Sequence, residues 1–409
     1  MSGGHPFANP LFSVPCQVTL DEKSRSCTRR PTVLMRKFLY LLFSLALLAV
    51  LITYASWTAD RPMGHYLSDL RINLAVDQGT PADRGNLLGI QPELFPTDYQ
   101  SPERLHRKLA AYLQTARDQG FLNDKTIVVL PEHIGTWLMV SGEKDEVYQA
   151  PTLKQAMHWL ALSNPLAFLR ALAAAQGDNR LDDAYLRMKA GAMARDYQIL
   201  FGGLAREFNV TLVAGSIVLP EPSVNEGELT VGRGALYNSS LVFGRDGRPI
   251  GQPQRQRYPA FDQQDVLQAE PDATHVIETP AGRLGVLIGT DSWYPLHYRQ
   301  LNEQGAQLIA VPAFVVGRDA WNKPWNGYKG LTTPSEVSLK PGEVNEGQAW
   351  RRLTLTSRLP VSQARGGVSV FLRGQFWDSG SAGQSFISHD GQQFADGEAR
   401  GARLLNLWL

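Results

Sequence analysis

The sequence predicts an α/β fold with helices packed outside mixed sheets, preceded by one membrane-spanning helix. Two observations support this fold class. From residue 86 onward, short apolar runs alternate with helical patterns, and both helices and tight turns separate them, which is typical of mixed sheets. Before these runs, residues 38–59 form one uninterrupted apolar stretch.

The apolar stretch Phe38–Ala59 contains no ionisable side chain except tyrosine. At about 1.5 Å rise per residue, a helix of this length crosses the roughly 30 Å hydrocarbon core of a bilayer. A cleaved signal peptide is the alternative. The stretch exceeds a typical signal core and no clear Ala-x-Ala cleavage site follows it, so the sequence favours an uncleaved signal anchor.

The charges on either side of this stretch predict its orientation, because basic residues are retained on the cytoplasmic side of a membrane. We therefore expect a single-pass protein with a cytoplasmic N-terminus and an extracytoplasmic main domain. Residues 1–33 are rich in Ser, Pro, Gly and charge and are predicted to be a disordered cytoplasmic tail. The basic residues before the stretch are Lys23, Arg25, Arg29, Arg30, Arg36 and Lys37, and those that follow closely are Arg61 and Arg71.

The first elements of the main domain are two strands with a helix between them. Asn86–Gln91 reads as a strand, and Thr126–Leu130 reads as a strand buried on both faces. The intervening helix is predicted to begin at Ser101, which can cap free N–H groups, with Pro102 in its first turn. Its apolar stripe consists of Leu105, Leu109, Tyr112 and Ala116.

Residues 151–208 are predicted to be mostly helical, with breaks at Asn164-Pro165 and at residues 177–179. The apolar stretch Trp159–Ala175 is interpreted as a core-facing helix pair, and a partner-binding cap is the alternative. Later helices are predicted near residues 298–304 and 348–358. Further strands are predicted at 211–215, 238–243, 285–288, 308–311, 368–372 and 385–388.

The composition excludes several classes of function. The chain has 40 basic and 39 acidic residues and a net charge of +1, so nothing indicates a nucleic-acid surface. Eight scattered histidines without Cys/His ligand spacing argue against a structural zinc site. No glycine-rich phosphate loop follows a strand, so we expect no nucleotide cofactor and no metal.

Five passages in register resemble the nitrilase, or carbon-nitrogen hydrolase, superfamily across about residues 86–395. The resemblance implies a four-layer αββα sandwich over residues 72–409, pairing of two copies, no cofactor, and a small amide-like ligand. It also implies a Glu base, a Lys and a Cys nucleophile that act on carbon-nitrogen bonds. The passages are Val129–Glu132, Tyr237–Gly247, Gly285–Pro295, Gly305–Pro312 and Gly383–Gly391.

Carried over onto this sequence, the resemblance makes Glu132 the base, directly after a strand and Pro131. A Glu that merely caps or solvates the strand end is the structural alternative. The cysteine position falls on Gly289, which has no atom that could attack a carbonyl. The lysine position falls best on Arg255, with Gln254 or Gln256 possible after a one-residue slip. The chain's only cysteines, Cys16 and Cys27, precede the membrane stretch.

This pattern favours a membrane-anchored pseudo-hydrolase that binds a ligand or partner without turning over amides. The alternative is an active amidase or acyltransferase with a relocated hydroxyl nucleophile, Thr290 or Ser292. Neighbouring side chains leave a strand end in different directions, so such a shift moves the nucleophile by several ångströms. Asp291 is expected to be structural. The aromatic loop with Trp321, Trp325 and Tyr328 is expected either to line a ligand cleft or to pin the loop to the sheet.

Overall fold

The computed structural model describes residues 33–61, 67–260, 263–272, 274–395, 397 and 400–409. The chain divides into two units, residues 1–59 and 60–409. Almost all of the predicted N-terminal tail lies outside the described residues. The first unit contains helix α1, Val33–Ala59, and the second contains the α/β domain.

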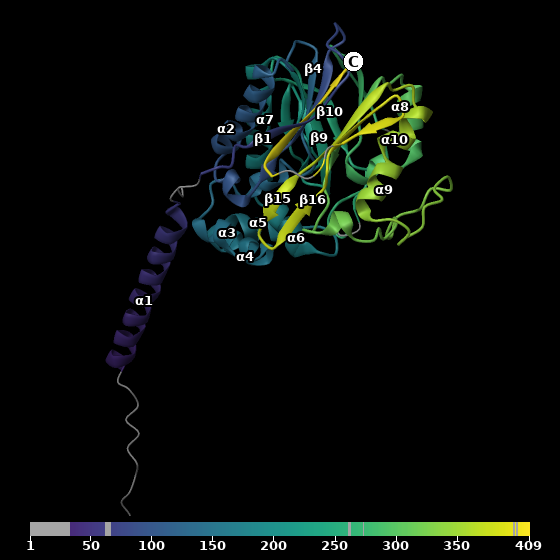
Figure 1. Cartoon of the computed structure of the whole chain (residues 1–409). Coiled ribbons are helices and arrows are strands. Elements are labelled where there is room, and N and C mark those ends of the chain that lie inside the picture. The colour runs from purple at the N-terminus through teal and green to yellow at the C-terminus, as the bar shows by residue number, and fades with distance from the viewer. Residues whose placement is uncertain (1–32, 62–66, 261–262, 273, 396, 398–399) are drawn as a thin grey trace, which may run out of the picture. The chain divides into compact units, whose positions relative to one another are not determined.

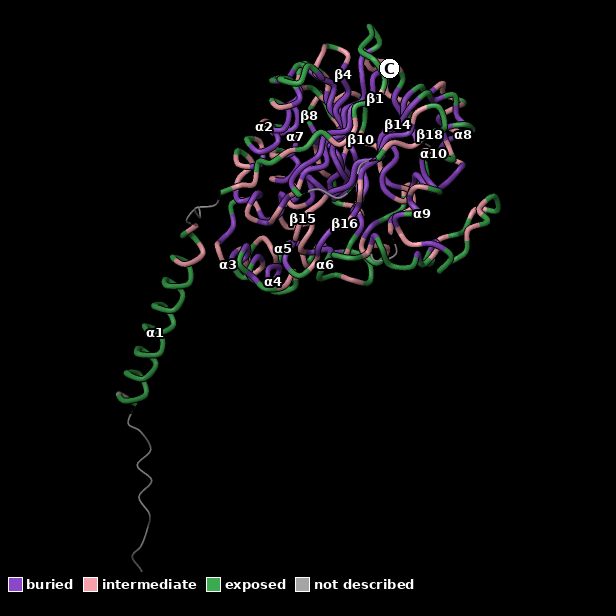
Figure 2. Tube along the Cα trace, viewed as in Figure 1, coloured by how far each residue is buried: buried purple, intermediate pink, exposed green. Residues whose placement is uncertain are grey.

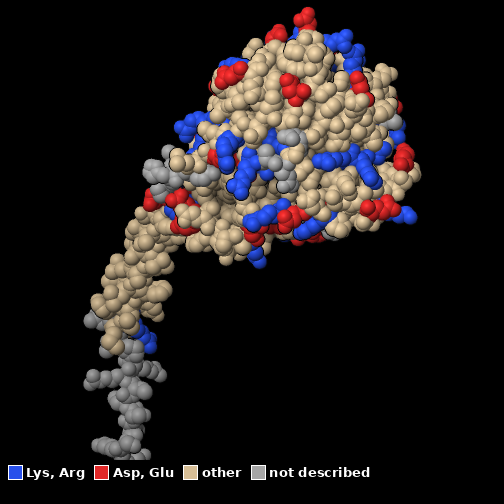
Figure 3. Space-filling view, viewed as in Figure 1, with Lys and Arg blue, Asp and Glu red and all other residues tan. Residues whose placement is uncertain are grey.

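Helix α1 is long and apolar enough to cross a membrane. Its candidate span is Met35–Ala59, with a mean hydropathy of 2.3, and none of that span is buried inside the protein. Figure 3 shows its surface almost entirely in uncharged atoms, with basic atoms near the N-terminal end. The helix is therefore a candidate membrane anchor or signal sequence near the N-terminus.

Two mixed sheets form the centre of the domain (Figure 1). In the described residues the first sheet has the order β1-β19-β2-β4-β5-β9-β10, with β6 also paired to β9. Its strands are β1 Ile72–Gln78, β2 Asn86–Gln91, β4 Thr126–Val129, β5 Thr211–Val213, β6 Ile217–Pro220, β9 Leu236–Phe243, β10 Pro249–Arg255 and β19 Ala402–Trp408.

The second sheet has the order β11-β12-β13-β14-β17-β18. Its strands are β11 Val276–Thr279, β12 Gly282–Val286, β13 Leu308–Ala313, β14 Gly366–Phe371, β17 Phe386–His389 and β18 Gln392–Phe394. Two small sheets lie beside them, formed by β3 Glu93–Leu94, β15 Arg373–Phe376 and β16 Ser379–Ala382, and by β7 Ser223–Asn225 and β8 Glu228–Thr230.

The two sheets pack face to face, and the side chains of each strand alternate between the core that separates the sheets and the outer helical layer. In β4, Ile127 and Val129 lie in the core between the sheets, whereas Val128 faces the helices of the outer layer. The inner faces of β12 to β14 contribute residues such as Val286 and Val368 to the same inter-sheet core. Since successive side chains of a strand point to opposite faces, both faces of each sheet become buried.

Helices cover the outer face of each sheet. α2 (Pro102–Asp118) and α7 (Ala190–Phe208) pack on the first sheet, and α8 (Pro295–Glu303), α9 (Glu346–Leu353) and α10 (Leu355–Arg358) pack on the second. Figures 1 and 2 show the buried sheets between these helical layers. The predicted four-layer αββα sandwich is confirmed. The remaining helices are α3 Asp145–Gln149, α4 Leu153–Ser163, α5 Pro165–Ala174 and α6 Arg180–Arg187.

The start of α2 follows from its sequence as predicted. The Ser101 side chain accepts a hydrogen bond from the backbone N–H of Arg104, and Pro102 occupies the first turn. The stripe of Leu105, Leu109, Tyr112 and Ala116 is buried against the first sheet. The helical breaks predicted at residues 164–165 and 177–179 are also present, between α4 and α5 and before α6.

Candidate active site

Glu132 lies three residues after Val129, the last residue of β4. The backbone around it is held by hydrogen bonds from Leu130 N–H to the Val213 carbonyl and from His133 N–H to the Ser216 hydroxyl. The Glu132 residue is only 4% exposed, and its Oε1 accepts a 2.8 Å hydrogen bond from the amide of Asn238. The carboxylate is therefore held inside the domain rather than solvated at a strand end.

Gly289 faces this carboxylate from the second sheet. It begins the 3-10 helix Gly289–Trp293 after β12, and its φ of +50° lies in the left-handed region that favours glycine. A Cβ atom at this position would lie 2.7 Å and 2.8 Å from the two carboxylate oxygens of Glu132. The carboxylate thus fills the space that the first atom of any side chain at position 289 would take.

The structure corrects the expectation for Arg255. Its guanidinium pairs with Glu270 at 3.2 Å, donates to the Pro222 carbonyl and lies over the Tyr237 ring. Tyr237 and Asn238 are neighbours on β9 and point to opposite faces of the sheet. Because Asn238 faces Glu132, Arg255 lies on the face that points away from it.

Gln256 occupies the position beside Glu132 instead. Its Oε1 accepts a 2.9 Å hydrogen bond from Asn238, whose amide also bonds Glu132. Its Nε2 donates to the Ile288 carbonyl at 3.1 Å and lies 3.4 Å from the Thr290 hydroxyl. A neutral amide therefore stands next to the acid. Of the residues considered for the lysine position, Gln256, one residue after Arg255, is the one whose side chain lies at this site.

The two hydroxyls beside Gly289 are both directed to backbone carbonyls. Thr290 Oγ1 donates its proton to the Tyr258 carbonyl and lies at the cavity wall. Ser292 is fully buried, and its hydroxyl donates to the Gly289 carbonyl at 2.7 Å. Each proton is thus engaged by a carbonyl oxygen rather than by the carboxylate of Glu132.

Asp291 holds a loop in place. Its buried carboxylate accepts hydrogen bonds from the backbone N–H groups of Arg257 and Tyr258, at 2.7 Å for the shortest. Burial raises the pKa of Asp291 to about 7, although these two N–H groups oppose that shift. The same loop carries Gln256, so Asp291 positions the segment that reaches the site.

The imidazole of His133 lies near Glu132 but does not neutralise it at neutral pH. Its Nε2 is 3.8 Å from Oε1 of Glu132, within ion-pair distance for a protonated ring. Burial lowers the pKa of His133 to about 4, so the ring is neutral near pH 7. The contact is therefore polar rather than ionic at that pH.

A cavity of about 400 Å³ opens beside the acid. Glu132, Gln256 and Thr290 form one part of its wall. Aromatic side chains form another part, and Lys323, Lys329 and Glu346 add charge. Burial raises the pKa of Glu346 to about 7, against the hydrogen bond that it accepts from the Trp350 indole. The aromatic lining consists of Trp293, Phe314, Tyr328 and Trp350.

The aromatic loop serves both roles that the sequence left open. Tyr328 lines the cavity, while Trp321 and Trp325 are buried in the core over the second sheet. Trp321 packs edge-on against Phe371 of β14, which pins the loop. In the part of the chain that the structure describes, no group of three or more His, Cys, Asp or Glu side chains could hold a metal ion.

Sequence reasoning missed several residues of this site. Asn238 lies inside the quoted passage Tyr237–Gly247, but only its contacts with Glu132 and Gln256 reveal a polar role. Glu346 and His133 carry no motif. An apolar run that ends in a Glu locates the acid, whereas partners that arrive from other strands become visible only in three dimensions.

Comparison with known proteins gives one sequence match and a set of distant structural matches. A family model described as carbon-nitrogen hydrolase matches residues 90–329. The search of curated proteins found no match. Among solved structures, the chain is similar to the amidase from Nesterenkonia sp. AN1, described as a member of the nitrilase superfamily.

Two structures of that amidase illustrate the similarity. A cysteine-to-serine mutant has a TM-score of 0.48 and 13% identity, with 80% of this chain and 92% of that chain covered. Another mutant shows the Michael addition of acrylamide at the active-site cysteine of that enzyme. It has a TM-score of 0.47 and 13% identity, with 80% of this chain and 93% of that chain covered.

Proposed function

Because the chain belongs to the carbon-nitrogen hydrolase family, we propose that it is a membrane-anchored, non-catalytic member whose pocket binds a small amide-like ligand. In this proposal α1 anchors the protein, the N-terminus is cytoplasmic and the main domain is extracytoplasmic. Pairing of two copies, which the family resemblance implies, stays a prediction.

The main support for this proposal is that the Glu132 carboxylate lies directly against Gly289. A covalent mechanism needs an attacking atom beside the base, and the space for such an atom is filled by the carboxylate itself. Removing a nucleophile from a covalent mechanism lowers the rate on the order of 10⁶-fold, about 8 kcal/mol of barrier. This supports a site that binds without forming an acyl intermediate.

The neutral Gln256 supports the same proposal. A lysine beside a reacting carbonyl would supply positive charge to a developing oxyanion. The Gln256 amide brings no charge, and its Nε2 is already engaged by the Ile288 carbonyl. Position 289 therefore offers no attacking atom, and the side chain next to Glu132 is a neutral amide rather than the lysine that the family resemblance implies.

The relocated-nucleophile alternative receives little support from Thr290 and Ser292. A hydroxyl must pass its proton to a base to become nucleophilic. Thr290 donates to the Tyr258 carbonyl, and Ser292 donates to the Gly289 carbonyl. A carbonyl oxygen cannot serve as that base, so neither hydroxyl is activated in this arrangement.

The open cavity supports ligand binding rather than a purely structural role. A degenerate site without a ligand would be free to fill with side chains, yet about 400 Å³ remains beside Glu132. The acid accepts hydrogen bonds, and the aromatic side chains Trp293 and Tyr328 offer flat apolar surfaces. A small ligand with an N–H donor and a flat amide group fits this combination.

The test uses the full-length protein purified in nanodiscs. Release of ammonia and amine is measured with a panel of aliphatic and aromatic amides, and binding of the same panel is measured by calorimetry. We expect binding of some amides without turnover, and weaker binding after Glu132→Gln, with Glu270→Gln as a control outside the cavity. Turnover that disappears in Glu132→Gln would refute the non-catalytic proposal and favour a relocated nucleophile.

A further inference from the structure

Helices α4 and α5 expose a concentration of large apolar side chains. Among the described residues, Leu166 is 67% exposed and Leu169 is 60% exposed, and Trp159 and Leu162 on α4 are also exposed. Figure 2 draws exposed segments along the outer edge of these helices. The core-facing interpretation of Trp159–Ala175 is therefore only half right. One side, with Ala156, Leu160 and Ala171, is buried, and the other faces outward.

The charged side chains that belong to α4 and α5 themselves are all basic. Residues 151–177 contain Lys154, His158 and Arg170 and no Asp or Glu. All three basic residues belong to the exposed side of α4 or α5. Leu and Trp on one face with Lys and Arg beside them is the pattern of helices that lie in the interface of an anionic bilayer.

The chain that leaves α1 is fastened to the corner between α4 and α5. Arg61, two residues after the last residue of α1, donates to the Ser163 carbonyl and to Asn164 Oδ1, both at 3.0 Å. Asn164 is the residue that joins α4 to α5. Two residues of extended chain span only about 7 Å. Arg61, at the start of the domain, is therefore tied to the corner between α4 and α5.

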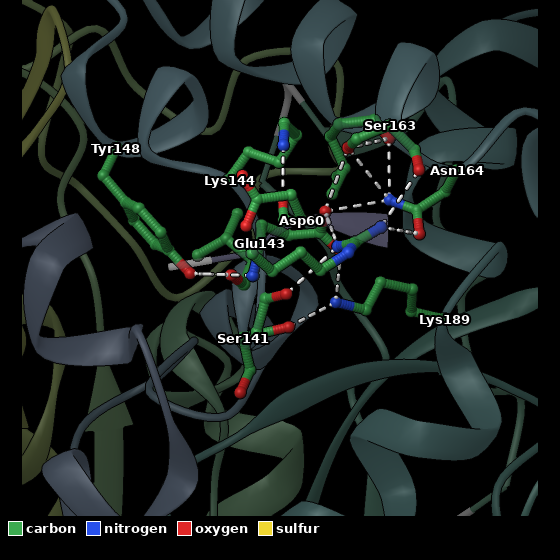
Figure 4. Close-up of polar contacts among 12 residues, drawn as sticks. Asp60, Ser141, Glu143, Lys144, Tyr148, Ser163, Asn164 and Lys189 are labelled. Atoms are coloured by element: carbon green, nitrogen blue, oxygen red, sulfur yellow. Dashed lines mark hydrogen bonds and ion pairs between the residues drawn. The ribbon is translucent and has the colours of Figure 1, made fainter. Parts of the chain in front are cut away.

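A buried carboxylate makes this attachment firm (Figure 4). Glu143 has a side chain that is 1% exposed, and it pairs with Arg61 at 2.5 Å and with Lys189 at 2.7 Å. It also accepts hydrogen bonds from the Ser163 hydroxyl and from the Asn164 amide. The Lys144 ammonium donates to the Asp60 carbonyl, so both residues after α1 are held by the domain.

From these contacts we infer that the outer face of α4 and α5 docks onto the lipid surface of the membrane that holds α1. The inference rests on the membrane anchor of the proposed function. Leu162, Leu166 and Leu169 enter the boundary between headgroups and acyl chains, Trp159 lies at the headgroup level, and Lys154 and Arg170 contact anionic headgroups. The contacts of Asp60 and Arg61 with the domain make the connection from α1 to this corner short in sequence.

The experiment places a fluorophore at single sites in the full-length chain. In a Cys16→Ser, Cys27→Ser background, Leu166→Cys is labelled with an environment-sensitive dye and reconstituted into phosphatidylcholine–phosphatidylglycerol vesicles with nitroxide-labelled lipid. Ile199→Cys on α7, where the native side chain is 71% exposed, is the matched control. We expect several-fold stronger quenching at position 166 than at position 199. Lys154→Glu with Arg170→Glu should weaken that quenching in anionic vesicles.

Four results would overturn the inference. Equal quenching at positions 166 and 199 shows that the face does not meet lipid. A dye at position 166 that is shielded from water but not quenched by lipid shows that a second copy or another protein covers the face. Leu45→Cys in α1 reports on the anchor. If the dye at position 45 is quenched and the dye at position 166 is not, the docking inference is refuted and the membrane anchor stands. If the dye at position 45 is not quenched, both the membrane anchor and the docking inference are refuted.

Discussion

The carboxylate of Glu132 and the α-carbon of Gly289 approach so closely that a side chain at position 289 fits only if the carboxylate moves. A Cβ at residue 289 would meet Oε2 at 2.7 Å, closer than ordinary van der Waals contact. Because Asn238 holds that carboxylate at 2.8 Å, the acid cannot yield without losing a buried hydrogen bond. The present position of the Glu132 carboxylate is thus compatible only with glycine at position 289.

We predict that Gly289→Ala destabilises the domain more than an alanine at a glycine with similar backbone geometry. Gly227→Ala is the control, because its φ is +83° and nothing lies within 4 Å of its Cβ position. Both changes cost roughly 1–2 kcal/mol of unfolding free energy through the left-handed backbone. Gly289→Ala should cost about 1–3 kcal/mol more, from the displaced, hydrogen-bonded carboxylate. Denaturant unfolding measures both values.

A double-mutant cycle separates the clash from the backbone cost of this change. In a Glu132→Ala background, the difference between Gly289→Ala and Gly227→Ala should shrink to a few tenths of a kcal/mol. An undiminished difference would mean that some group other than Glu132 crowds position 289.

We predict that a thiol at position 289 is activated by a lysine at 256 and not by one at 255. Gly289→Cys with Gln256→Lys should react with an activated ester about tenfold faster than Gly289→Cys alone. A nearby cation lowers the thiol pKa and stabilises the oxyanion. Gly289→Cys with Arg255→Lys is the matched control, because Arg255 faces Glu270 and Tyr237. Intact-mass measurement of the acyl adduct follows the reaction, and equal rates for the two lysines would contradict this register.

The buried Asp291 should make stability depend on pH in a defined direction. Its pKa is raised to about 7 in the folded protein from an ordinary value of 3.8. Its contribution is therefore fully present below about pH 4 and is lost as the pH rises through about 7. Asn at 291 has an oxygen to accept the same backbone hydrogen bonds but does not titrate. The Tm of Asp291→Asn relative to the native protein should rise between pH 4.5 and pH 7.5, and a constant difference would refute the prediction.

The buried ion pairs of Glu143 with Arg61 and Lys189 should contribute strongly to the stability of the domain. Glu143→Ala leaves Arg61 and Lys189 without their shared carboxylate, which should cost about 3 kcal/mol and lower the Tm by several degrees. Glu336→Ala is the control, because its pair with Arg299 is about half exposed on both sides and exposed pairs contribute little. Equal effects of the two changes in thermal unfolding would show that the cluster is only peripheral.

Much of the fold was predictable because it follows from local patterns. The helix from Pro102 needs only a capping Ser101 and an apolar stripe, and the strand at Thr126–Val129 needs only a short apolar run before Pro131. The strands β1 and β19 were not predicted. They pair with each other although more than 300 residues separate them, and neither carries a motif. Their pairing depends on a long-range contact that no local window contains.

The sequence by itself determined the apolar anchor candidate, the order of the elements, the acid at Glu132 and the lack of a cysteine at Gly289, because composition and local period carry these features. Only the tertiary structure decided which neighbour of Arg255 reaches the acid, since one residue along a strand reverses the side-chain face. It also decided that the Glu132 carboxylate fills the empty position, and that half of α4 and α5 remains outside the core. Both outcomes depend on atoms that other elements bring to the same place.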